Sequence, residues 1–69
     1  MIKLAAEAEQ RRLNEARDAL VRDFTPMGLP SHVVEQALDT AVRRFERARI
    51  REFVPILAER EARSRLRRR

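Results

Sequence analysis

The sequence has 69 residues, a net charge of +5, no cysteine and one histidine. A chain this short forms a single domain that buries only roughly 60% of its unfolded surface, so its core needs support. The missing cysteines exclude disulfides and, with His32 as the sole histidine, exclude a zinc site of about four Cys or His ligands, which leaves oligomerisation as the means of support.

The residue types are those of helices. Hydrophobic residues make up 43% and charged residues 39% of the sequence, yet there are only one glycine and three prolines. A composition rich in alanine, leucine, glutamate and arginine favours helices over strands. Apolar residues recur at helical spacing between charges of both signs, which argues against disorder. We therefore expect an all-α fold, a single three-helix bundle that spans residues 1–69.

The first helix is expected over residues 3–24, which contain no glycine or proline. Its apolar residues recur every three or four positions and form one stripe along the helix. The stripe consists of Leu13, Ala16, Leu20 and Phe24. The segment Thr25–Pro30, which holds two prolines and the glycine, then predicts a turn.

The second helix is expected over residues 32–47. Ser31 stands where its hydroxyl can accept a hydrogen bond from a free amide of the first turn, so it is the predicted N-cap. The apolar stripe of this helix consists of Val34, Leu38, Ala41 and Phe45.

The third helix is expected over residues 50–67, and Pro55 indicates where it starts. Proline is tolerated in the first turn of a helix but not in the interior. Pro55 also fits a second interpretation, in which the second and third helices are one long helix that kinks there. Over all three helices, the predicted core consists of Leu13, Leu20, Phe24, Val34, Leu38, Phe45, Phe53 and Leu57.

The sequence contains no catalytic constellation, so we expect neither enzyme activity nor a cofactor. Ser31 and His32 are adjacent at a helix start, where their side chains diverge. The carboxylates of Glu59 and Glu61, two positions apart, point to different helix faces. No stretch approaches the ~20 apolar residues of a membrane span, and the first ten residues lack the features of a signal peptide. We expect a cytoplasmic protein with no membrane contact.

The C-terminal end is rich in arginine and suggests an alternative function. Residues 63–69 hold five of the sixteen basic residues, which leaves eleven basic against eleven acidic residues in the body. We expect this end to fray. It could neutralise phosphates, so a small basic nucleic-acid-binding protein is the alternative. The candidates for phosphate contact are Arg63, Arg65, Arg67, Arg68 and Arg69.

One segment resembles a known family. The run Ile50-Arg51-Glu52-Phe53-Val54-Pro55-Ile56-Leu57 is similar to the signature that opens the third helix of the bacterial three-helix-bundle dimerisation domain. Phe24-Thr25-Pro26 and Leu29-Pro30 occupy the places of the turn before that family's second helix. The resemblance covers about residues 19–65. It implies a three-helix bundle whose function is to dimerise.

Members of that family occur alone or N-terminal to low-molecular-weight-phosphatase-like arsenate reductases. The phosphate loop of such an enzyme needs a cysteine, which this sequence lacks. The resemblance therefore implies the assembly module without the enzyme.

Composition and resemblance both favour a non-catalytic protein–protein interaction module, most directly a homodimer formed through apolar helix surface. An isologous two-fold interface uses the same apolar edge twice. Such edges are expected on the first and third helices, and the interface candidates are Ile2, Ala6, Ile56 and Leu66. A heterologous protein is the alternative partner for the same apolar surface.

Overall fold

The computed structural model describes residues 2–47 and 51–68, and the side chains of residues 7–47 and 52–68. This part of the chain forms three α-helices and no strand. The helices are α1 (Ile2–Phe24), α2 (Ser31–Arg44) and α3 (Val54–Arg67). Short 3₁₀ turns, Thr25–Met27 and Arg51–Phe53, follow α1 and precede α3. The prediction of an all-α three-helix bundle is confirmed.

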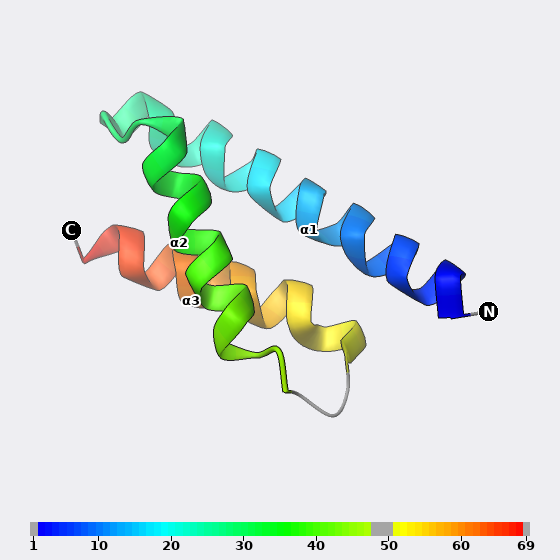
Figure 1. Ribbon diagram of the computed structural model, residues 1–69. Helices are drawn as coiled ribbons and strands as arrows, with labels where there is room; N and C mark the ends of the chain where they lie inside the picture. Colours follow the sequence, from blue (N-terminus) through cyan, green and yellow to red (C-terminus); the bar gives the residue numbers. More distant parts are fainter. Residues whose placement is uncertain (1, 48–50, 69) are drawn as a thin grey trace.

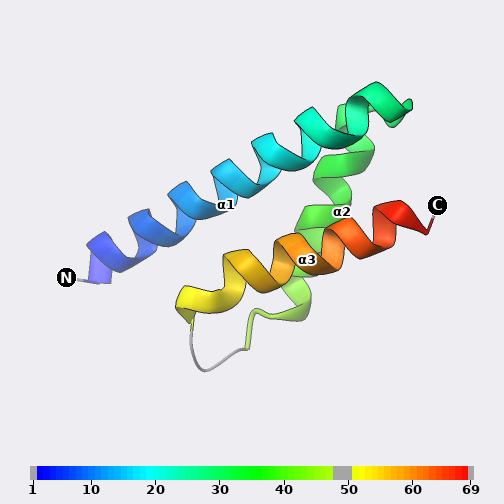
Figure 2. The same cartoon turned by 180° about the vertical axis from the view of Figure 1, so that it is seen from behind.

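The bundle is elongated, with extents of 41 × 18 × 14 Å. Figure 1 shows α1 and α3 running in the same direction, with α2 returning across them. Figure 2 shows the same arrangement from behind, and in both views the N-terminal turns of α1 extend past the start of α3. The start of α1 and the end of α3 therefore lie at opposite ends of the molecule.

The turn after α1 lies where the sequence predicts it. The amide of Leu29 donates to the carbonyl oxygen of Phe24 at 3.3 Å, and the amide of Gly28 donates to that of Thr25 at 3.0 Å. This pair of bonds is the Schellman motif, which requires a residue in the left-handed region. Gly28 takes that place with φ of 96°. Because a Cβ there would meet nothing within 4 Å, backbone conformation alone accounts for the glycine.

The boundaries of α2 differ from the prediction at both ends. Pro30, with φ of −61° and ψ of 148°, is the N-cap, and no side chain caps the helix. The prediction of Ser31 as N-cap is therefore wrong, because Ser31 is already the first helical residue. At the other end, the amide of Phe45 donates to the carbonyl of Val42 at 3.0 Å. This three-residue spacing tightens the last turn and ends α2 at Arg44, not at residue 47.

Helices α2 and α3 are separate, so the single kinked helix is the wrong interpretation. A turn follows α2, and α3 begins at Val54 after a 3₁₀ turn. Pro55 is the second residue of α3, in the first turn as predicted, where its missing amide costs no hydrogen bond. The sequence predicts that the third helix begins at residue 50, which lies outside the described part. Because residues 51–53 form a 3₁₀ turn, α3 begins later than predicted, at Val54.

Ten described residues form the buried core, and four of them are alanines. Alanine side chains let helix axes approach closely, but each buries little apolar area. The core therefore contains few large side chains for three helices. Its members are Ala16, Leu20, Phe24, Val34, Leu38, Ala41, Val54, Ala58, Ala62 and Leu66. Leu13 and Phe45, two predicted core residues, are half-buried.

The prediction of Phe53 and Leu57 as core residues is wrong. Their exposed fractions are 49% and 37%. The buried face of α3 is instead the series Val54, Ala58 and Ala62, which continues to the last turn. This series repeats every four residues along the whole helix, so its burial places an apolar side chain in the core at every turn. The alternative series, which starts with Phe53 and Leu57, has no apolar residue after Leu57.

The contrast between two phenylalanines tests this assignment of the core. Phe24→Ala should lower the free energy of unfolding by about 3–5 kcal/mol because it empties a buried site. Phe53→Ala should cost less than about 1 kcal/mol in the monomer because that ring is half exposed. Urea denaturation followed by circular dichroism at low protein concentration measures both. Equal losses would contradict the orientation of α3.

Candidate protein-interaction surface

The outward side of α3 carries three large apolar side chains close together. Phe53, Ile56 and Leu57, called here the outer patch, have exposed fractions of 49%, 57% and 37%. Ile56 and Leu57 are the third and fourth residues of α3, and Phe53 is its N-cap. Single exposed apolar side chains are ordinary on proteins, whereas large contiguous apolar patches are typical of interaction sites.

The position of the outer patch follows from the phase of α3. Residues that repeat every four positions lie on one side of a helix, so the buried Val54 and Ala58 face inward together. Ile56 lies half a turn away from both and points outward. The sequence indicates this exposure indirectly, because the helix contains two interleaved apolar series and only one of them can be buried.

The four interface candidates from the sequence have different outcomes. Ile56 is 57% exposed and lies in the outer patch. Leu66 is only 4% exposed, so its side chain already packs inside the bundle and is not available to a partner. The side chains of Ile2 and Ala6 lie outside the described residues. Phe53 and Leu57, which the sequence assigned to the core, join Ile56 on the surface.

A shallow groove runs beside the outer patch, between α1 and the first turns of α3. Its volume is about 210 Å³. It is lined by Arg12, Glu15, Ala16, Pro55, Ile56 and Glu59. The groove therefore joins the outer patch to a charged strip of α1.

Arg63 connects α3 to α1. Its Nη1 donates to Oδ2 of Asp23 at 2.9 Å, and its Nη2 donates to Oε2 of Glu59 at 3.0 Å. The guanidinium carbon also lies 5.7 Å from the ring centroid of Phe24, within cation–π range. The hydrogen bond from Arg63 holds the pKa of Asp23 below its ordinary value. Arg63 is thus a structural residue that joins two helices.

Glu61 connects α3 to α2 in the complementary way. Its Oε2 accepts from Nε of Arg65 at 3.1 Å and from Nη1 of Arg44 at 3.3 Å. The hydrogen bond from Arg65, with the nearby charge of Arg44, lowers the pKa of the Glu61 carboxyl. α3 is therefore joined to both other helices by charged side chains on the flanks of its buried face.

These contacts divide the predicted phosphate-contacting arginines. Arg63 and Arg65 hold carboxylates of the chain itself, while Arg68 donates from Nη1 to Oγ of Ser64 at 3.2 Å. Arg67 is exposed and Arg69 lies outside the described residues. α3 continues to Arg67, so Arg63, Arg65 and Arg67 all lie within the helix.

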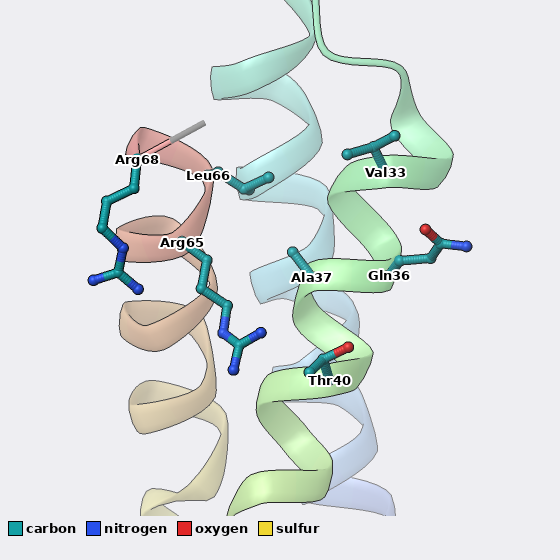
Figure 3. A pocket seen from close by; sticks show the side chains of 7 residues that line it. All are labelled: Val33, Gln36, Ala37, Thr40, Arg65, Leu66 and Arg68. Atoms are coloured by element: carbon teal, nitrogen blue, oxygen red, sulfur yellow. The ribbon is translucent and has the colours of Figure 1, made fainter.

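A hollow of about 300 Å³ separates the C-terminal half of α3 from α2. Figure 3 shows the Arg65 side chain descending between the two helices toward Thr40, whereas Arg68 descends on the other side of α3. Of the two arginines that line the hollow, Arg65 pairs with Glu61 and Arg68 donates to the hydroxyl of Ser64.

A basic surface lies on the outward side of α3 beyond the outer patch. It is lined by Arg60, Arg63, Ser64, Arg67 and Arg68. Arg60 and Arg67 are exposed, and neither pairs with a carboxylate among the described residues. The outward side of α3 is therefore apolar in its first turns and cationic afterwards.

The described part of the chain holds no cluster of three His, Asp or Glu side chains suited to a metal ion. None of its helices has the length and apolar character needed to cross a membrane.

The fold places the chain among all-α three-helix bundles. Comparisons with protein-family models, with curated proteins and with solved structures find no match.

The lowered pKa values of Asp23 and Glu61 predict acid-sensitive stability. A carboxyl whose pKa is lower in the folded than in the unfolded state stabilises the fold fully above about pH 5 and loses that contribution as the pH falls through its folded pKa. The free energy of unfolding should therefore decline from about pH 5 to pH 2. Arg63→Met should reduce this decline because it removes the main cause of the Asp23 shift.

Urea denaturation at a series of pH values measures the effect. Arg43→Met is the matched control, because it removes an exposed arginine of α2. The same pH profile in both variants would show that Arg63 does not stabilise the ionised Asp23.

Proposed function

We propose that this chain is a non-catalytic protein–protein interaction module that forms a homodimer through the outer patch. The observation that carries the proposal is the cluster of Phe53, Ile56 and Leu57 on the outward side of α3, which are 49%, 57% and 37% exposed to water. When a second copy covers this cluster, the same apolar area of each chain is removed from contact with water, which favours association.

The small core supports the proposal. Four alanines among ten buried residues leave Leu20, Phe24 and Leu66 among the few large buried side chains. The sequence contains no cysteine, so no disulfide supplements this core. A short chain with a thin core gains stability from dimerisation, because binding to the folded state favours folding by mass action.

The resemblance to the bacterial three-helix-bundle dimerisation domain supports it independently. The residues that carry the resemblance include all three members of the outer patch, within Ile50–Leu57. The segment that suggests dimerisation from sequence is thus the segment whose side chains are exposed on the surface.

Substitution in the outer patch tests the proposal. Wild type should sediment with twice the 8.1 kDa mass of one chain at concentrations of tens to hundreds of micromolar. Ile56→Gln should raise the dissociation constant about tenfold or more, because it places an amide in an apolar contact. Sedimentation equilibrium over a concentration series measures both masses.

Met27→Gln is the matched control. Met27 is 74% exposed and lies beyond the far end of α1, beside the last turn of α3, so its substitution should leave the dimer intact. A wild-type chain that remains an 8.1 kDa species throughout would contradict homodimerisation and leave a heterologous protein as the partner for the patch.

A small basic nucleic-acid-binding protein is the second candidate. The observation that favours it is the exposed, carboxylate-free pair of Arg60 and Arg67 on one side of α3, with Arg68 beside them. Such a surface binds phosphates without reading sequence, and its affinity falls steeply with salt.

A salt titration tests this second candidate. Fluorescence anisotropy of labelled duplex DNA should show binding at low salt. The plot of log K against log salt should become less steep by about two units in the Arg67→Gln/Arg68→Gln variant, because two phosphate contacts are lost. No binding of wild type at low salt would eliminate this function.

A further inference from the structure

We propose that two copies of this chain join with their α3 helices antiparallel, so that Glu52 of each copy faces the partner's Arg60. The inference rests on the proposed homodimer and adds its register. It comes from the distribution of charge around the outer patch.

The outward side of α3 is asymmetric along its length. Its first turns carry the outer patch, and the turns after it carry the exposed Arg60 and Arg67. Glu52 precedes the patch, in the 3₁₀ turn that leads into α3, and its side chain is exposed. An acid thus stands at one end of the apolar cluster and a base at the other.

This asymmetry distinguishes the two ways in which a two-fold axis can pair α3 helices. A parallel pair with patch on patch would place Arg60 against the partner's Arg60 and Glu52 against the partner's Glu52. Like charges in contact are unfavourable and reject that register. An antiparallel pair brings opposite charges together at both ends of the patch, and the cationic C-terminal turns point away from each other.

The spacing fits a two-fold axis that passes near Ile56. Glu52 and Arg60 each lie four residues from Ile56, one before it and one after it. Their separation along the helix is about 12 Å at the rise of an α-helix. A two-fold axis at Ile56 therefore places Glu52 opposite the partner's Arg60 at each end of the interface. The apolar side chains of the two patches meet between these charged pairs.

Both charged residues are available for this contact. Among the residues that the structure describes, neither Glu52 nor Arg60 takes part in an ion pair, in contrast to Glu59, Glu61 and Arg63. Because the same patch carries both charges, it is complementary to itself, which is the property that an isologous interface needs. A second copy is therefore the occupant that the charges favour.

Charge reversal tests the register. Glu52→Arg alone places two arginines at each end of the patch, and Arg60→Glu alone places two glutamates there. Each single variant should raise the dissociation constant of the dimer about tenfold relative to wild type. A mixture of the two single variants should associate as a heterodimer with near wild-type affinity, because each arginine then faces a glutamate.

Sedimentation equilibrium and native mass spectrometry of the separate and mixed variants measure these constants. The matched controls are Asp39→Arg and Arg43→Glu, the same reversals at exposed positions of α2, which should leave the dimer unchanged. Circular dichroism establishes that all variants fold.

The outcomes separate the register from the proposed function. Weakened single variants with recovery in the mixture support the antiparallel register. A wild-type dimer that the Glu52 and Arg60 reversals weaken no more than the α2 controls overturns the register while homodimerisation stands. Weakening without recovery in the mixture also overturns it. A wild-type chain that is monomeric at every concentration overturns both proposals.

Discussion

The rotation of α3 about its own axis is the constraint on which the rest of this structure depends. The burial of Val54, Ala58, Ala62 and Leu66 determines the direction in which every other side chain of α3 points. Arg63 then lies beside Asp23 of α1, and Glu61 lies beside Arg44 of α2. The same rotation turns the outer patch toward solvent. A rotation that buried Phe53 and Leu57 would expose the four-residue series and separate these ion pairs.

The small side chains of the buried face explain why the charged flanks matter. Ala58 and Ala62 contribute little apolar area, so contact between the helices comes from close approach. Close approach also brings arginines and carboxylates of neighbouring helices within hydrogen-bond distance. Exposed ion pairs are individually weak, but those at Arg63 and Glu61 share partners and are partly shielded. They orient α3 as much as they stabilise it.

The arginines of α3 consequently have two roles that composition does not reveal. Arg63 and Arg65 neutralise carboxylates of the chain itself, on the flanks of the core. Arg60 and Arg67 remain exposed on the outward side. Arg60 therefore leaves an exposed positive charge next to the outer patch, and Arg67 another further along α3.

Local chemistry made much of the fold predictable. The helix count follows from apolar periodicity, the end of α1 from the left-handed conformation that Gly28 adopts, and the start of α3 from the position of Pro55. Each of these features depends on residues within one or two turns of chain. The composition likewise excluded disulfides, because there is no cysteine to form them.

Only the tertiary structure decided which face of α3 is buried, because the helix carries two apolar series and periodicity alone does not choose between them. That choice placed Phe53 and Leu57 on the surface and Leu66 in the core. It also assigned Arg63 to Asp23, 40 residues away in sequence. Both outcomes depend on the packing of three helices together, a property that no single helix encodes.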